Sequence, residues 1–443
     1  MQGRLQARSA RGSVGRVSPD TAADLVDDYL RLGLLFDRIE PGFVDAYTGD
    51  PALRAEAENA PAPDPAALAR RARDLRNALP GGLPADRAEF LGAHLRALEC
   101  SARKFAGETI GFVDEVEAYF DVRIAPADED VYADAHRRIA AALGVPGATG
   151  EALREAYAAH RRTEEIPSNL VRPLVHEFSG ALRSTVRSRF GLPESEVVEF
   201  EIVSDEPWSG FNYYLGGYRS TVAINTDLPQ YLSGLPGLVA HEAYPGHHTE
   251  HCRKEQLLVE RGGQNEQTIF LVNTPQCLMA EGLADHALVA AQGRDWQPWA
   301  AEVYADFGLR YDAEKARAVS AATAGLLHVR QDAALALHDA HRDPDEVAAF
   351  LQRWLLVPAE RARQMLRFLT SPLWRAYIST YVEGYELLDR WLDGPAAGVE
   401  RPAAGIERIV ESEREAAETR LDRFGRLLDE PLTPAALRAE SAT

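Results

Sequence analysis

The sequence predicts a mostly α-helical protein of the α+β class, with a large helical body and a small antiparallel β-sheet. Three observations support this prediction. Apolar residues recur with the helical period over most of the chain, and strict polar–apolar alternation is confined to the region near residues 197–225. The chain has 443 residues, of which 46% are hydrophobic, so it can bury a large core.

The N-terminal half is expected to be helical. Proline-rich segments at residues 60–65 and 79–84 interrupt it, and residues 85–121 have the pattern of one or two long helices. Further helices are expected at about residues 128–143, 149–162 and 167–190. The first helix, between residues 20 and 39, has an apolar stripe formed by Leu25, Tyr29, Leu32, Leu35 and Phe36.

The alternating region predicts the sheet. A half-buried strand is expected at Val197–Val203. Two further strands, Phe211–Leu215 and Ser220–Asn225, flank the pair Gly216-Gly217, which is typical of a β-hairpin turn. Helices resume after residue 235, with amphipathic runs at 313–341, 344–353, 358–369, 372–392 and 404–428.

The composition of the chain disfavours several classes of binding partner. The formal net charge of −20, from 48 basic and 68 acidic side chains, disfavours nucleic acid and anionic membrane surfaces. Three cysteines without CxxC spacing indicate buried thiols in a reducing compartment. No run approaches the ~20 apolar residues of a membrane span, and no apolar segment follows the arginine-rich start. We therefore expect a cytoplasmic protein, and the sequence predicts no oligomeric state.

The stretch AHEAYPGHH at residues 240–248 resembles a zinc-binding helix with an interruption. In the HExxH pattern two histidines one turn apart share a zinc ion, and the glutamate is the general base. Here the histidine that follows His241 is His247, which on a regular helix would be displaced by about 9 Å along the axis. The two side chains can share an ion only if the helix is interrupted.

Pro245 and Gly246 supply that interruption. The proline ring clashes with the carbonyl of His241 in a helix, and glycine accepts unusual dihedral angles. Two extra residues can therefore loop out and return the next histidine toward His241. We expect His247 to be the second ligand, with His248 as the alternative.

A third ligand is predicted on the apolar segment at residues 278–286, which contains EGLAD. Glu281 would complete the ligand set, and Gly282 leaves space beside it. Asp285, one turn on, is placed to accept a hydrogen bond from the second ring nitrogen of a ligand histidine. One Zn²⁺ ion is the expected cofactor.

HEAYPGHH followed by EGLAD resembles the bacterial family called domain of unknown function 885, which is grouped with thermolysin-like zinc peptidases whose third ligand is a glutamate. The similarity also includes residues 207–214, Asn225, residues 325–328 and residues 381–384. It implies a mainly helical fold with zinc at the floor of a deep active-site cleft, bound by His241, His247 and Glu281. It further implies that Glu242 is the general base.

Other residues have expected roles at this site. Tyr381, in YVEG, is a candidate donor to the oxyanion. His328, Tyr214 and Asn225 are candidates for substrate binding through the family resemblance. The arginines that are candidates to bind a peptide carboxylate are Arg219, Arg330 and Arg375.

These residues predict one compact catalytic unit. We expect a disordered tail at residues 1–17, an N-terminal helical lobe at 18–195, the small sheet with the metal-site helices at 196–292, and a C-terminal helical lobe at 293–443. The expected function is zinc-dependent cleavage of peptide bonds. One alternative is hydrolysis of an amide in a small molecule or natural product. A non-catalytic helical binding protein is the other, although His241 and Glu242 weigh against it because a binding protein needs no general base.

Overall fold

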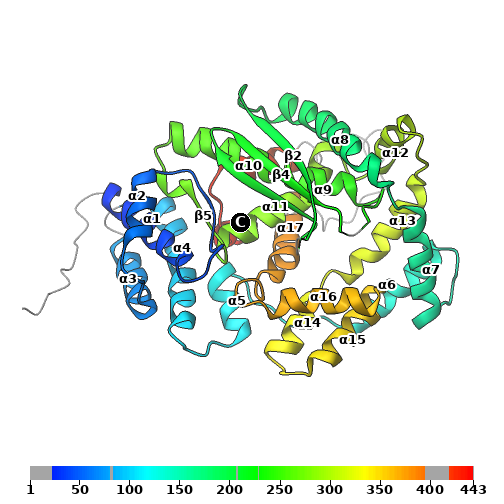
Figure 1. The fold of residues 1–443 in the computed structure, drawn as a ribbon, viewed down its shortest axis with the longest axis horizontal. Coiled ribbons are helices and arrows are strands. Elements are labelled where there is room, and N and C mark those ends of the chain that lie inside the picture. The colour runs from blue at the N-terminus through cyan, green and yellow to red at the C-terminus, as the bar shows by residue number, and fades with distance from the viewer. Residues whose placement is uncertain (1–21, 80–82, 206–207, 228, 395–418, 443) are drawn as a thin grey trace, which may run out of the picture.

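The computed structural model describes residues 22–79, 83–205, 208–227, 229–394 and 419–442. It confirms a mostly helical protein with little sheet (Figure 1). The predicted tail at residues 1–17 and most of the predicted helix at 404–428 lie outside the described residues, and residues 419–429 are helical. None of the described helices is long and apolar enough to cross a membrane.

The N-terminal helices begin and end near the predicted residues. α1 (Ala22–Asp37) buries its apolar stripe. α2 (Pro51–Asn59) and α3 (Pro65–Ala78) each begin with a proline after an aspartate cap, because proline lacks the N–H that the first turn leaves unpaired. The other helices of this half are α4 (Ala85–Phe105), α5 (Phe112–Phe120), α6 (Glu129–Ala142), α7 (Gly150–Thr163) and α8 (Ser168–Arg189).

The three-stranded sheet is mixed, which corrects the antiparallel sheet that we predicted. β3 (Gly210–Gly216) and β4 (Arg219–Asn225) form the predicted antiparallel hairpin. β2 (Val197–Val203), however, pairs in parallel with β4, and the strand order is β2-β4-β3. β4 is the most buried of the three strands, as suits its place at the centre, and β3 lies at an edge.

A second sheet was not predicted. β1 (Val44–Tyr47) pairs antiparallel with β5 (Ile269–Leu271), which lies more than two hundred residues later in the chain. β1 has only four residues, too few to show a clear alternating pattern. This pairing attaches the N-terminal helices to the centre of the molecule.

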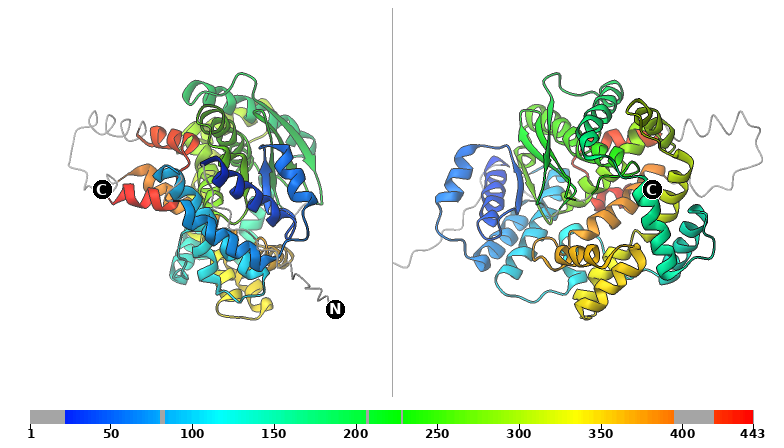
Figure 2. Two further views of the ribbon diagram at one scale, coloured as in Figure 1. Left: turned by 90° about the vertical axis from the view of Figure 1, so that its left-hand side faces the viewer. Right: turned by 45° about the vertical axis from the view of Figure 1, so that its right-hand side comes forward.

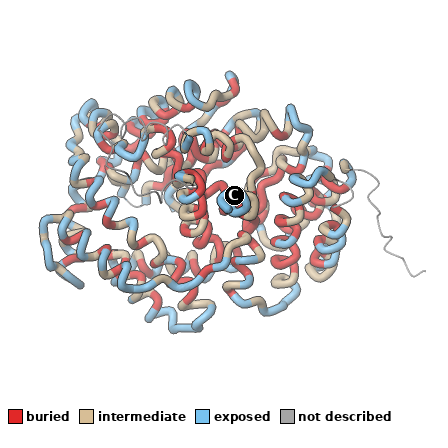
Figure 3. Tube along the Cα trace, turned by 180° about the vertical axis from the view of Figure 1, so that it is seen from behind, coloured by how far each residue is buried: buried red, intermediate tan, exposed pale blue. Residues whose placement is uncertain are grey.

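The centre is formed by α9 (Leu235–Glu242), α10 (His247–Lys254) and α11 (Pro275–Gln292). α11 is buried along almost its whole length and contacts α9. Figure 3 shows buried segments running through the middle of the molecule, with exposed residues on the outer helices. A π-helical segment, η2 (Glu255–Arg261), and a short helix, η3 (Asn265–Thr268), connect α10 to β5.

The C-terminal helices differ from the prediction in two places. The run at 313–341 is divided by a short 3₁₀ turn, η4 (Ala324–Leu326), and the run at 372–392 contains a π-helical turn, η5 (Thr380–Gly384). Figure 2 shows the last helix beside α17, in agreement with their contacts. The helices are α12 (Gln297–Asp306), α13 (Ala313–Thr323), α14 (Val329–His338), α15 (Pro344–Leu355), α16 (Ala359–Thr370), α17 (Tyr385–Asp393) and α19 (Pro434–Ser441).

Candidate metal centre

The histidine-rich stretch is not a continuous helix. α9 ends at Glu242 and α10 begins at His247, and the residues between them include a cis Tyr244–Pro245 peptide bond. A Cβ atom on Gly246 would lie 1.9 Å from the carbonyl oxygen of His241, so only glycine fits there. The interruption predicted from the proline and the glycine is therefore present.

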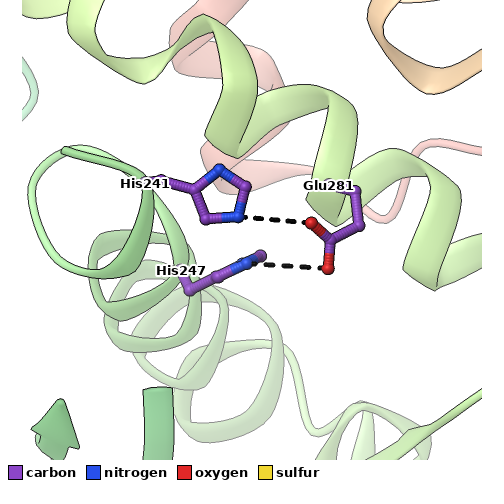
Figure 4. A group of neighbouring side chains, drawn as sticks. All are labelled: His241, His247 and Glu281. Carbon is purple, nitrogen blue, oxygen red and sulfur yellow. Dashed lines mark ion pairs between the residues drawn. The ribbon is translucent and has the colours of Figure 1, made fainter. Parts of the chain in front are cut away.

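The three residues predicted as ligands come together. His241 and His247 lie at the facing ends of α9 and α10, and both point toward Glu281 on α11 (Figure 4). The Nε2 atom of His241 lies 3.2 Å from Oε2 of Glu281, and Nε2 of His247 lies 3.8 Å from Oε1. Among the described residues, these three form the one group whose ligand atoms lie within 4.8 Å of each other as a metal site requires.

This group fits a zinc ion. Ligands about 2 Å from a tetrahedral zinc are separated by roughly 3.3 Å, close to the separations of the imidazole and carboxylate atoms here. Oε2 of Glu281 is buried and accepts no hydrogen bond, so it has a lone pair to offer. Two imidazoles and one carboxylate leave a fourth position for water or substrate, as catalytic zinc sites do.

Asp285 lies where the sequence predicted it. Its Oδ1 atom is 3.1 Å from Nδ1 of His241, so the Nδ1–H donates to the carboxylate and Nε2 faces Glu281. Burial alone would lower the pKa of His241, but Asp285 and Glu281 outweigh it and hold that pKa well above 6.5. Burial likewise opposes the ionised form of Glu281, yet the two histidines and Tyr377 keep its pKa below the usual value.

His248, the alternative ligand, does not belong to the group. It is fully buried, its Nδ1 lies 2.8 Å from the Ser220 hydroxyl, and its Nε2 lies 3.2 Å from Glu196. Glu196 also binds Arg183 and accepts a hydrogen bond from Tyr244. The backbone turn after Gly246 aims successive side chains in different directions, so only one of the two histidines can face His241.

Glu242 lies between the metal group and β3. The side-chain amide of Asn212 donates to the Glu242 backbone carbonyl at 2.7 Å. A Cβ atom on Gly210 would lie 3.0 Å from Glu242 Oε1, so β3 passes directly against the carboxylate. Burial raises the pKa of the carboxyl group, and the charges of Glu281 and Asp285 raise it further against the effect of the histidines. The residue is thus a carboxylate with a strengthened affinity for a proton.

The segment before α17 brings Tyr377 to the group, with Tyr381 beside it. Tyr377 donates a hydrogen bond to Oε1 of Glu281 at 2.7 Å. The predicted Tyr381 is half-buried, its ring centroid lies 5.8 Å from that of Tyr377, and the charges of Glu281 and Asp285 help burial to raise its pKa. The sequence analysis missed Tyr377, although its spacing of four residues from Tyr381 places both on one helical face.

Close packing of two glycines brings this segment to the metal group. A Cβ atom on Gly282 would lie 2.7 Å from the backbone of Gly384, and one on Gly384 would lie 2.5 Å from the carbonyl of Leu278. The backbones of α11 and η5 therefore touch directly. The space that we expected beside Glu281 is occupied by η5.

Asp45 is a further carboxylate that the sequence analysis missed. It lies on β1, and burial raises its pKa to about 7, with the charges of Glu281 and Glu242 adding to that effect. Only the pairing of β1 with β5 brings it near the site, so no local pattern in the sequence marks it.

The three residues expected to bind substrate form hydrogen bonds with other parts of the protein. Tyr214 is buried, donates to Glu255 and stacks on His251. Asn225 binds the backbone of Trp208 and Asp227, and so shapes the loop after β4. His328 pairs with Glu386 at 2.7 Å. Their hydrogen bonds organise neighbouring protein segments, and the structure gives no support to the predicted substrate contacts.

The three arginines that are candidates to bind a peptide carboxylate have different surroundings. Arg219 pairs with Glu199 at 3.2 Å on the exposed sheet, and Arg375 pairs with the buried Glu115. Arg330 is exposed and forms no ion pair with any described residue.

Comparison with known proteins identifies no family. No protein-family model matches the chain, and no curated protein is similar to it in sequence. A solved structure of a provisionally named lipoprotein from Colwellia psychrerythraea is 14% identical over 96% of this chain and 77% of its own, with a TM-score of 0.49. A provisionally named lipoprotein of unknown function from Shewanella oneidensis is 12% identical over 93% of this chain and 73% of its own, with a TM-score of 0.42. Structural similarity at this level supports no conclusion about the chemistry of this chain.

Proposed function

We propose that this protein is a zinc-dependent hydrolase that cleaves peptide bonds, and that it belongs with the thermolysin-like peptidases to which its motifs are similar. The observation that supports this most strongly is the meeting of His241, His247 and Glu281 beside the buried Glu242. A binding protein would have no use for a carboxylate of raised pKa beside a metal site.

The residues divide the chemistry among them. When bound, a zinc ion supplies Lewis acidity, which makes water a stronger acid and a carbonyl a better electrophile. Glu242 takes the proton from the attacking water and transfers it to the leaving amine, and its raised pKa suits both transfers. Tyr381 keeps its hydroxyl proton, because its pKa is raised, and so serves as a donor to the oxyanion.

The sheet favours a peptide over a small amide as the substrate. β3 is an edge strand, and it runs past Glu242 at Gly210. An extended peptide can pair with such an edge through backbone hydrogen bonds. The exposed side chains of Tyr213 and Leu215 on the same strand offer apolar contacts to the residues of that peptide.

Metal content and one conservative substitution test the proposal. The protein purified without added metal, or titrated with Zn²⁺, should hold about one equivalent. The Glu242→Gln variant should keep that zinc and lose roughly 10²–10⁴-fold in peptide hydrolysis, because it removes the base alone. Glu199→Gln, on the exposed face of the sheet, is the matched control and should leave the rate unchanged.

Two results would contradict the proposal. One is a protein that takes up less than about a tenth of an equivalent of zinc on titration. The other is undiminished peptide hydrolysis by the Glu242→Gln variant. A library of peptides analysed by mass spectrometry, with and without the protein, also reports whether peptides or only small amides are cleaved.

A further inference from the structure

One face of β3 carries a row of aromatic rings. Because side chains alternate along a strand, Phe211 and Tyr213 lie on the face opposite to the buried Asn212 and Tyr214. The centroid of the Phe211 ring lies 4.7 Å from that of Tyr213 and 5.5 Å from that of Trp208, which precedes the strand. These three contacting rings, Trp208, Phe211 and Tyr213, are named the aromatic strip.

The aromatic strip belongs to an exposed apolar patch. Tyr213 exposes 43% of its surface, and Leu215, next on the same face of β3, exposes 61%. Among the described residues, the other exposed large apolar side chains are Val197, on β2 of the same sheet, and Val131. Three of the four thus lie on one small sheet, and apolar groups gathered in this way on a surface mark a binding site.

The open edge of β3 offers backbone groups in a fixed phase. The N–H of Asn225 donates to the carbonyl of Ser209 at 2.9 Å, and in an antiparallel ladder every second residue from there bonds to the same partner strand. The N–H and C=O groups of Gly210 and Asn212, which lie between those residues, therefore point away from β4. Among the described residues, no strand pairs with β3 on that side.

The aromatic strip begins beside the proposed general base. Gly210 directly precedes Phe211, and a Cβ atom on Gly210 would lie 3.0 Å from Oε1 of Glu242. The side-chain amide of Asn212 donates to the backbone carbonyl of Glu242 at 2.7 Å. A peptide strand on this edge therefore passes Glu242, and every second one of its side chains lies on the same face as the aromatic strip.

We propose that the aromatic strip binds side chains of the substrate, and that the protein prefers peptides with large apolar side chains, above all aromatic ones, at two alternate positions beside the cleaved bond. This inference rests on the proposed hydrolase function. The two positions are those that lie opposite Phe211 and Tyr213 when the peptide pairs with the edge of β3. Trp208 packs against Phe211 and supports its ring.

The chemistry of this face favours apolar side chains over charged ones. Directly opposed side chains on one face of two paired strands lie about 4.5–5.5 Å apart, so the rings of the aromatic strip contact the peptide side chains. Aromatic pairs are stabilised beyond the burial of their area. The acids of this face, Glu199 and Glu201, lie on β2 with β4 in between, so β3 itself offers no charged partner.

A set of matched peptides tests the preference. The zinc-loaded protein is offered peptides of one length in which Phe, Leu or Gln is placed at each position in turn, and the products are identified by mass spectrometry. We expect kcat/KM to fall about two- to tenfold when Gln replaces Phe at either of two positions separated by one residue, as for the loss of one aromatic pair.

Variants of the strand assign that preference to the aromatic strip. The double variant Phe211→Ser/Tyr213→Ser should cleave the Phe and Gln peptides at equal rates. Tyr213→Ser alone changes an exposed side chain and should remove the preference at one position only. The matched control is Val197→Ser, which removes an exposed apolar side chain from the other edge of the same sheet and should leave the preference unchanged. Circular dichroism confirms that each variant is folded.

Backbone methylation supplies a readout that does not depend on catalysis. In the Glu242→Gln background, calorimetry measures the binding of the Phe peptide with an N-methyl group at each position in turn. Binding should weaken at alternate positions only, because every second residue of a paired strand directs its N–H toward β3. The sensitive positions are the two apolar ones if the peptide runs parallel to β3, and the residues between them if it runs antiparallel.

The outcomes separate the two proposals. Cleavage of all peptides without preference, or a preference that survives in the double variant, overturns the role of the aromatic strip and leaves the peptidase standing. Equal tolerance of an N-methyl group at every position does the same. A wild-type dimer that the double variant dissociates, with no change in preference, would instead show that the strip joins two copies of the chain. Cleavage of no peptide by the zinc-loaded protein overturns both proposals.

Discussion

His241 interacts with an acid through each of its two ring nitrogens. Nε2 faces Glu281, and Nδ1 donates to Asp285. The second contact fixes the tautomer and the plane of the ring, so the lone pair of Nε2 is aimed at the position where an ion would be bound. The affinity of the proposed site for zinc should therefore depend on Asp285, which is not one of the three proposed ligands.

The variant Asp285→Ala tests this dependence. Loss of the hydrogen bond should weaken zinc binding by about 10–100-fold while leaving the fold intact. Competition with a chelator of known affinity measures the change. The control is Asp295→Ala, which removes an aspartate paired with Arg317 on the surface and should have no effect. Equal zinc affinities for the two variants would contradict the role assigned to Asp285.

Zinc uptake should release a proton from His241. Without metal, the pKa of this imidazole is held well above 6.5, so the ring is protonated at pH 7, whereas a zinc ligand must be neutral. The pairing with Asp285 and Glu281 stabilises the metal-free fold fully below pH 6.5, and this contribution is lost as pH rises through the raised pKa. Zinc affinity should accordingly increase with pH over the same range.

Calorimetry in buffers of different ionisation enthalpy measures how many protons are released when zinc binds. At pH 7 the apparent enthalpy of zinc binding should vary with the buffer, with a slope of about one proton per zinc. The variant His241→Ala should lose both the binding and the slope. An enthalpy that is independent of the buffer would show that the imidazole is already neutral.

That His241, His247 and Glu281 come together was predictable because their signals are local. His241, Glu242 and His247 fall within one short motif, and EGLAD marks Glu281 and Asp285. Tyr377 and Asp45 lack such a signal, because Tyr377 reaches the site through a hydrogen bond to the distant Glu281, and Asp45 through the pairing of β1 with β5. His248 could not be excluded from the sequence, since its exclusion depends on the dihedral angles of the turn and on Glu196.

At the scale of elements, the turn between α9 and α10 determines the site. Its backbone folds back so tightly that the N–H of Gly246 donates to the carbonyl of Ala240 at 2.9 Å. A side chain at this glycine has no room, because the nearest carbonyl would be 1.9 Å from its Cβ. The separation between His241 and His247 therefore depends on one residue without a Cβ.

Two glycine variants test that conclusion. Gly246→Ala should abolish zinc binding and lower the melting temperature, because the turn must open. Gly237→Ala, in the preceding helix α9, meets no atom within 4 Å and should be neutral or stabilising by up to ~1 kcal/mol. Thermal unfolding and zinc titration of both variants check this. Normal zinc binding by the Gly246→Ala variant would contradict the argument.

The secondary structure was predictable where it is periodic or marked by turn residues. The hairpin β3–β4 was predictable from the pair Gly216-Gly217, and both glycines adopt positive φ, Gly216 at the end of β3 and Gly217 in the turn with Tyr218. The parallel pairing of β2 and the short strand β1 could not be predicted, because strand pairing is decided by tertiary packing. The π-helical turn η5 was also missed, and it is the segment in which Gly384 packs against the backbone of α11.

At the scale of the whole molecule, the proposed metal site joins three central helices. α9, α10 and α11 each supply one proposed ligand, and their apolar residues belong to a hydrophobic cluster that extends from Leu25 to Leu437 among the described residues. Since an unfolded chain does not hold the three ligands together, zinc binding is coupled to the stability of the whole core.

Zinc should therefore raise the melting temperature. At a free zinc concentration of a hundred times the dissociation constant, the folded state gains about 2.7 kcal/mol. Scanning calorimetry with zinc, and again with excess chelator, measures the shift. His247→Ala, which removes one ligand, should unfold at the same temperature under both conditions. A wild-type transition that is insensitive to the chelator would contradict the coupling.

The contact between Gly282 and Gly384 has a consequence for synthesis on the ribosome. A nascent chain that has emerged through α11 already carries all three ligands, but Tyr377, which hydrogen bonds to Glu281, is made 96 residues later. Until then α11 lacks the backbone that packs against it. The packing surface of α11, and with it the hydrogen bond to Glu281, is therefore complete only after the C-terminal segment has been synthesised.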